Sequence, residues 1–312
     1  MERQIALVLI FSILFVGACR NTAAPVTTFN ESDYKQQIQK WRTGRLASLI
    51  REDSWLTLVG LFWLDEGENR FGSGAKNAIV LPQNKTPLVA GAFWLKDGRV
   101  RLAAESGAGI TTDGKPLDDA AKTVELRDDT DDRGPTVLKL GTLIINVVKR
   151  SDRVGVRVKD TQSAARLQFK GLEYFPVDPK SRIEASFERY EPPKTIPITN
   201  VLSMTDNETS PGALAFEVGG QTYRIDPILE KGETDLFVMI ADGTTGTETY
   251  GAGRYLYVPP PDDSGKVVID FNKAYNPPCA FTNYATCPLP PRQNHLPFRI
   301  EAGEKKYAGT VH

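Results

Sequence analysis

The alternation of apolar and polar residues predicts one helix near the start of the chain. Behind a capping residue at Asn30 or Ser32, the apolar positions Tyr34 and Ile38 recur at helical spacing, which predicts an amphipathic helix over residues 30–51. We assign it to a helical region, 30–54, and expect its aromatic face to pack on the rest of the protein.

After residue 54 the pattern changes to short runs of Val, Ile, Leu, Phe and Trp that alternate with Gly, Asp and Asn turns. This is typical of a sandwich or barrel, so the predicted fold class is mostly β. A proline-rich elbow at 174–179 suggests a boundary between an N-terminal β-sandwich, 55–180, and a C-terminal β-rich half, 181–312, packed against it. The predicted strands are 56–64, 78–81, 90–95, 100–103, 122–126, 136–140, 142–150, 153–159, 167–171, 195–202, 213–218, 221–227, 235–241, 254–258, 266–270 and 296–301.

The first residues predict export from the cytoplasm. An apolar run over 5–16 follows a charged start and precedes small residues, which is the pattern of a signal peptide, and it is shorter than the about 20 residues that a membrane-spanning helix needs. The segment VGAC resembles the bacterial lipobox, whose cysteine is diacylated. We therefore expect a signal peptide at 1–18, lipidation at Cys19, a tether at 19–29, and a lipid-anchored protein facing the periplasm or cell exterior. An ordinary cleaved signal is the alternative.

Composition and charge exclude several functions. The formal net charge of −1 provides no basic surface for nucleic acid, so membrane contact through the lipid and a small-molecule ligand are the expected partners. The chain has two histidines, and it contains no G-x-S-x-G, H-E-x-x-H, P-loop or G-x-G-x-x-G motif. We predict no metal and no cofactor.

Two further cysteines, Cys279 and Cys287, form an even pair once Cys19 is assigned to lipid. In an oxidising compartment we expect them to form a disulfide. Two free thiols and a metal site remain alternatives, although the spacing is not that of zinc ligands.

The stretch 242–304 is the candidate site, because polar residues lie there between glycines and prolines that form tight turns. Arg254 follows a Gly-Ala-Gly turn and could be a bidentate partner for Glu248, for Asp270 or for a ligand anion. The candidate ligand-binding residues are Tyr250, Arg254, Asn272, Tyr275 and Asn294.

Three functions remain open. The protein could bind a small polar or anionic ligand, such as an envelope saccharide or peptide. It could be a hydrolase that uses Glu248 and Asp270 as acid and base, or a structural envelope protein without a ligand. In the last case the polar residues would form a buried network that holds the proline-rich loop in place.

Several segments resemble the bacterial and archaeal family known as domain of unknown function 1684: GLFWLDEGENRFG, RVGVRVKD, GTETYGAGRYL, DFNKAYNPPCAF, CPLPPRQN and IEAGEKKY. The resemblance implies no established activity, but its characteristic segments contain both cysteines and every candidate residue of the 242–304 stretch. His295 stands where the family resemblance leads us to expect arginine. The segment GENRFGSGAKNAIVLP, followed by TTDGKPL, also resembles a forkhead-associated-like sandwich, without the Ser and His of a phosphothreonine pocket.

Overall fold

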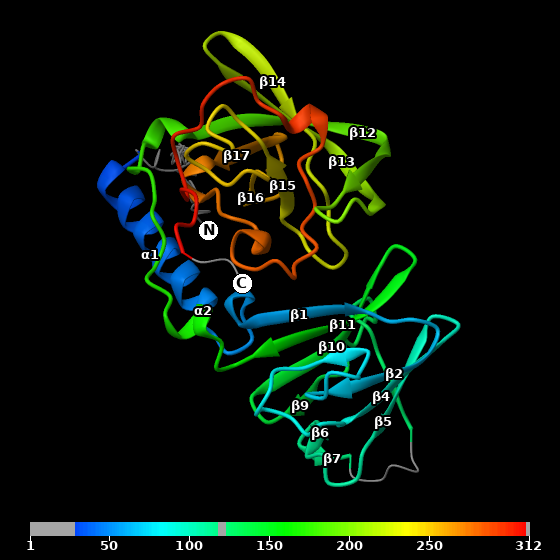
Figure 1. Ribbon diagram of the computed structural model, residues 1–312. Helices are drawn as coiled ribbons and strands as arrows, with labels where there is room; N and C mark the ends of the chain where they lie inside the picture. Colours follow the sequence, from blue (N-terminus) through cyan, green and yellow to red (C-terminus); the bar gives the residue numbers. More distant parts are fainter. Residues whose placement is uncertain (1–28, 118–122, 310–312) are drawn as a thin grey trace, which may run out of the picture.

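The computed structural model describes residues 29–117 and 123–309. The predicted signal peptide, Cys19 and all but the last residue of the predicted tether lie outside them. A β-sandwich and a C-terminal β-rich half lie one above the other, and the helix α1 (Glu31–Leu49) runs along one side of the C-terminal half as far as the edge of the sandwich (Figure 1). The predicted fold class, mostly β with an N-terminal helix, is confirmed.

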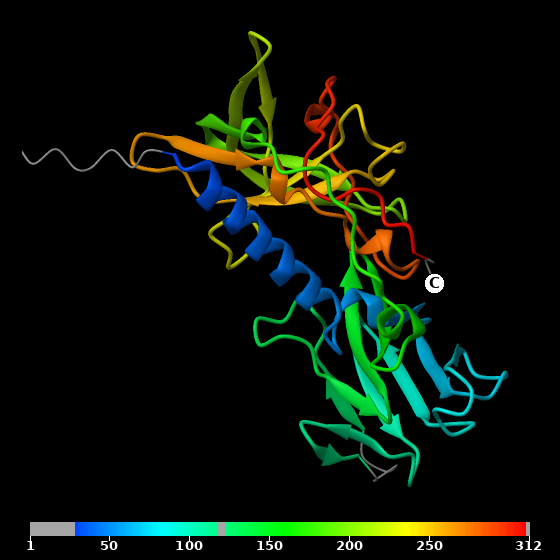
Figure 2. The same ribbon diagram turned by 90° about the vertical axis from the view of Figure 1, so that its left-hand side faces the viewer.

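Helix α1 begins after Asn30, the first of its two candidate caps. The side chain of Asn30 accepts hydrogen bonds from the backbone N–H groups of Ser32 and Asp33, which supplies partners for otherwise unpaired donors of the first turn. Two of its three buried residues, Tyr34 and Ile38, are those that the pattern selected; the third is Leu49. The helix crosses from the C-terminal half to the sandwich (Figure 2). Within residues 29–117 and 123–309, no helix is long and apolar enough to cross a membrane.

The sandwich consists of two sheets around one apolar core. Val156, Phe71 and Phe93 belong to this core, and the two phenylalanine rings stack with 4.5 Å between centroids. Its strands are β1 (Leu58–Trp63), β2 (Gly67–Gly72), β3 (Ile79–Val80), β4 (Gly91–Lys96), β5 (Arg99–Ala104), β6 (Ile110–Thr112), β7 (Lys115–Pro116), β8 (Val124–Leu126), β9 (Leu138–Leu140), β10 (Leu143–Arg150) and β11 (Arg153–Asp160). They form sheets of order β1-β11-β10-β9-β6-β7 and β3-β2-β4-β5-β8.

The C-terminal half has a separate core to which Leu214, Val238 and Ile269 contribute. Its strands are β12 (Arg182–Thr199), β13 (Thr205–Val218), β14 (Gln221–Ile225), β15 (Leu236–Ile240), β16 (Arg254–Val258) and β17 (Lys266–Asp270). They form a sheet of order β14-β13-β12-β17 and an antiparallel pair β15-β16. Short 3₁₀ helices lie at Trp55–Thr57, Pro179–Ser181, Phe271–Lys273, Pro278–Ala280 and Arg292–Asn294.

Two predicted strands are absent, and three observed strands, β2, β6 and β7, were missed. Instead of a strand at 167–171, the chain forms the short helix α2 (Ala164–Leu167), whose first turn is capped by the side chain of Ser163. Residues 296–301 form no strand, because their backbone makes isolated hydrogen bonds to the loop near residue 242 and to the Arg254 side chain instead of a continuous ladder. Strand β2 was missed because its glycines and charged residues hide the alternation.

Candidate functional site

Arg254 is the centre of a buried network, but with other partners than predicted. Its side chain is 0% exposed, and its guanidinium donates to the Asp242 carboxylate at 2.8 Å and to the carbonyl of Ile300 at 3.0 Å. It also donates to the carbonyl of Ala302. Asp242 is held in turn by the N–H and hydroxyl of Thr244, each at 2.7 Å. A planar guanidinium suits this site, because its N–H donors point in several fixed directions and can reach several acceptors at once.

The two carboxylates predicted to pair with Arg254 lie elsewhere, which corrects that prediction. Glu248 forms an ion pair with Arg299, and both side chains are about half exposed. Asp270 accepts a hydrogen bond from the Tyr34 hydroxyl at 2.7 Å and lies next to Asn272. Neither carboxylate lines the large cavity described below, so the structure does not assemble them as an acid–base pair.

Most of the predicted ligand-binding residues have structural roles. Asn272 binds the backbone of Asp178 through both its amide oxygen and its nitrogen, at 3.0 and 2.8 Å. Asn294 does the same with Asp226, at 2.8 and 3.0 Å. The Tyr250 hydroxyl donates to the carbonyl of residue 279 at 2.9 Å. These side chains replace missing backbone partners in an irregular region.

Cys279 and Cys287 are free and buried in the structure, which differs from the disulfide expected from the sequence. The backbone N–H of Cys279 donates to the sulfur of Cys287 at 3.0 Å. Burial raises the pKa of the Cys287 thiol, and its contact with Cys279 raises this pKa further. A raised pKa disfavours the thiolate, which is the nucleophilic form of a cysteine.

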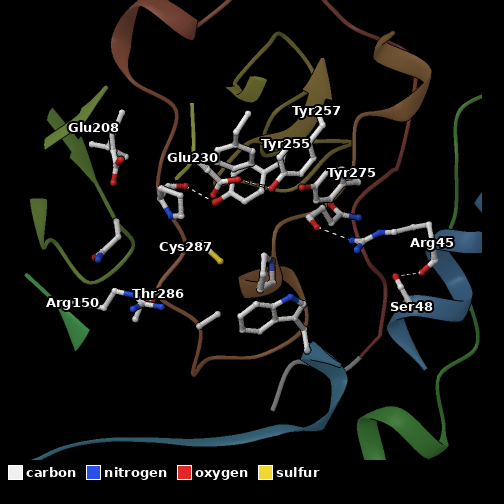
Figure 3. A pocket seen from close by; sticks show the side chains of 18 of the residues that line it. Arg45, Ser48, Arg150, Glu208, Glu230, Tyr255, Tyr257, Tyr275, Thr286 and Cys287 are labelled. Carbon is white, nitrogen blue, oxygen red and sulfur yellow. Dashed lines mark hydrogen bonds between the residues drawn. The ribbon is translucent and has the colours of Figure 1, made fainter. Parts of the chain in front are cut away.

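A cavity of about 1290 Å³ lies where α1, the sandwich and the C-terminal half meet (Figure 3). Of the predicted site residues, Tyr275 lines it, and Cys287 forms part of its wall. Aromatic side chains from all three parts contribute to its surface: Trp41, Trp55, Phe237, Tyr255, Tyr257 and Tyr275. Large, mostly apolar cavities with a few convergent polar groups are the usual form of ligand sites.

Arg157 of β11 is the most unusual residue of this cavity. It is only 7% exposed, and its Nε is buried without a hydrogen bond. No carboxylate within residues 29–117 and 123–309 forms an ion pair with it, and its guanidinium carbon lies 5.2 Å from the centre of the Trp55 ring. Burial, together with the nearby charge of Arg150, lowers the pKa of Arg157 to about 10.

The neighbouring arginines of the cavity already have partners. Arg150 forms an ion pair with Asp129 at 2.8 Å and donates to the hydroxyl of Thr286 at 3.1 Å. Arg45 of α1 forms an ion pair at 2.9 Å with Glu304, which is fully buried. Of the arginines that line the cavity, Arg157 is therefore the one that forms no ion pair with a described residue, so its guanidinium can bind an anion.

Carboxylates line another part of the cavity. Asp206, Glu208 and Glu230 come from the C-terminal half. Burial raises the pKa of Glu208, and the charges of Asp206 and Glu230 raise it further. Glu230 accepts a hydrogen bond from the Tyr257 hydroxyl at 2.8 Å, and Asp206 accepts one from Ser151 at 2.8 Å.

The sequence reasoning missed this cavity because its charged residues lie outside 242–304. The sequence pattern that could have identified Arg157 is weak. In RVGVRVKD, the residues at 153, 155, 157 and 159 alternate with buried valines, as the solvent-facing residues of an ordinary strand do. An arginine in a central strand, β11, between β1 and β10, was the available indication.

Comparisons with known proteins find relatives but no activity. The model of the family described as "Protein of unknown function (DUF1684)" matches residues 167–305. The solution NMR structure of an uncharacterized protein of Haloarcula marismortui is 33% identical, over 45% of this chain and 79% of that one, with a TM-score of 0.39. A structure described as "Structural and functional analysis of phosphothreonine-dependent FHA domain interactions" is 20% identical, over 33% of this chain and 96% of that one, with a TM-score of 0.22. No curated protein matches. Through residues 167–305, the chain belongs to the DUF1684 family of proteins of unknown function.

Proposed function

We propose that this protein binds a small anionic ligand with an aromatic or apolar body in the cavity between α1, the sandwich and the C-terminal half. The observation that carries the proposal is Arg157, which is buried in the cavity wall without a hydrogen-bonding or ion-pairing partner among the described residues. Burying an unpaired charge is costly, and a bound phosphate, sulfate or carboxylate would supply the missing partner. Arginine suits this role because its planar fork binds such groups bidentately.

The rest of the cavity supports a ligand of some size. Its aromatic residues provide flat apolar surface for a ring or sugar face. Gly44 lies in the middle of α1 and also lines the cavity, and a Cβ added there would meet nothing within 4 Å. A glycine inside a helix costs roughly 0.5 to 1 kcal/mol relative to alanine, so its presence here is best explained by the space that it leaves.

The test uses 1-naphthyl phosphate, an aromatic anion, in a fluorescence titration. Arg157→Gln is expected to weaken binding at least about tenfold, because loss of one partner of a buried charge pair typically costs 2 kcal/mol or more. Arg153→Gln is the matched control, because Arg153 lies on the same strand with its side chain exposed. If wild type does not bind the probe, or if both variants bind like wild type, the proposal is wrong.

Gly44→Leu tests the cavity without changing a charge. The added side chain should project into the open space at Gly44 and weaken 1-naphthyl phosphate binding at least about tenfold, because overlap with the ligand is costly. Gly44→Ala, which adds one methyl group, should instead raise the thermal midpoint, since alanine favours helix formation. Unchanged binding by a folded Gly44→Leu protein would place the ligand elsewhere.

We also propose that the chain is a lipid-anchored protein of the bacterial envelope, because of the apolar run and the VGAC segment that ends at Cys19. Mass spectrometry of the membrane fraction should find Cys19 as a diacylated N-terminus. Cys19→Ala should leave an unprocessed or soluble form. An unmodified N-terminus beyond Cys19 in the wild-type membrane fraction would contradict this proposal.

A further inference from the structure

We propose that the ligand also carries a cationic ammonium group, which the carboxylates Glu208 and Glu230 and the ring of Tyr257 bind. This inference rests on the proposed function and narrows the ligand class: a zwitterion with an anionic group at Arg157 and an organic cation at the acidic end of the same cavity.

Among the described residues, the acidic end of the cavity has no lysine or arginine paired with its carboxylates. None of Asp206, Glu208 and Glu230 forms an ion pair with a lysine or arginine of the described ranges 29–117 and 123–309. Glu208 is partly buried, and its carboxylate accepts no hydrogen bond from the residues that the structure describes. Three uncompensated carboxylates that face one partly enclosed space disfavour one another, in agreement with the raised pKa of Glu208. A positively charged group in that space would offset the electrostatic repulsion among these carboxylates.

The surroundings suit an organic cation better than a metal ion. Within the described residues, no group of three or more His, Cys, Asp or Glu side chains could hold a metal. Aromatic rings lie beside Glu230 instead: Tyr257 and Tyr275 are stacked at 6.5 Å and Phe237 lies 5.2 Å from Tyr257. Ammonium groups bind well where aromatic faces and carboxylates meet, because both present negative potential.

The opposite charges of the cavity come from different parts of the fold. Arg157 and Arg150 belong to the sandwich, whereas Glu208 lies on β13 and Glu230 follows β14 in the C-terminal half. Figure 3 shows Glu208, Glu230 and Tyr257 in the upper part of the view, with Cys287 and Arg150 below them. A ligand with both charges would therefore contact both halves of the protein at once.

The experiment compares probes that differ only in the cationic group. Phosphocholine, phosphoethanolamine, choline chloride and inorganic phosphate are each used to displace 1-naphthyl phosphate from the protein. We expect at least one of the two zwitterions to bind tenfold or more tightly than inorganic phosphate. The double variant Glu208→Gln/Glu230→Gln should reduce zwitterion affinity to that of phosphate and leave 1-naphthyl phosphate binding unweakened.

Glu217→Gln is the matched control, because Glu217 lies on the same strand as Glu208 with its side chain exposed. Circular dichroism establishes that each variant is folded. If neither zwitterion exceeds phosphate, or if the double variant binds them like wild type, the cationic subsite is overturned while the anion site stands. If 1-naphthyl phosphate itself does not bind in an Arg157-dependent manner, the proposed function fails, and this inference fails with it.

Discussion

Arg254→Met is expected to lower the free energy of unfolding by about 3 to 5 kcal/mol, because it leaves the Asp242 carboxylate buried without its cation. The same change also removes the hydrogen bonds that Arg254 donates to the carbonyls of Ile300 and Ala302. These hydrogen bonds hold the C-terminal segment against β16. Arg254→Lys should recover only part of the loss, since an ammonium cannot reproduce the planar fork. Urea denaturation followed by circular dichroism measures the effect.

Arg299→Met provides the control for this result. Arg299 also pairs with carboxylates, Glu248 and Glu301, but its side chain is 47% exposed. Exposed pairs contribute about 0 to 1 kcal/mol, so the denaturation midpoint should hardly change. Equal midpoints for Arg254→Met, Arg299→Met and wild type would show that the buried network does not hold the fold together.

Arg157→Met is expected to have the opposite effect on stability, raising the free energy of unfolding of the ligand-free protein by about 0.5 to 2 kcal/mol, while abolishing 1-naphthyl phosphate binding. The reason is that Arg157 incurs the desolvation cost of a buried charge without a compensating ion pair. Methionine has a similar length and suits an apolar environment beside Trp55. Such exchange of stability for function is common at binding sites.

Thermal unfolding with and without the probe checks this expectation. At a probe concentration of about 100 times the dissociation constant, wild type should gain about 2.7 kcal/mol and Arg157→Met should gain nothing. If Arg157→Met destabilises the ligand-free protein as strongly as Arg254→Met, then Arg157 has a structural role and the proposed site loses its main support.

The candidate stretch 242–304 was predicted only in part from its local sequence. Its glycines, prolines and polar residues allowed a buried network around Arg254 as one of three alternatives, and Arg254 is buried and paired with Asp242. The partners were wrong, because three of its acceptors are backbone carbonyls of residues 300 to 304. Every residue has such a carbonyl, so no side-chain pattern reveals which of them an arginine will reach.

The sequence by itself determined the elements whose causes are local. Asn30, one of the two candidate caps, starts α1 because its side chain caps the helix, and Asp97-Gly98 forms the turn between β4 and β5 because both residues tolerate positive φ, here 50° and 74°. The valines of RVGVRVKD likewise predicted β11 and its buried face, because successive side chains of a strand alternate in direction.

Only the tertiary structure decided what covers the other face of β11. By alternation Arg157 belongs to a polar row, and in an isolated sandwich that row would face water. Here the C-terminal half and α1 enclose the cavity together with the sandwich, which removes Arg157 from water and places it in one cavity with carboxylates more than 40 residues away in the chain. The burial of a charge depends on long-range packing that the periodicity of a single strand does not encode, and for this reason the cavity was not predicted.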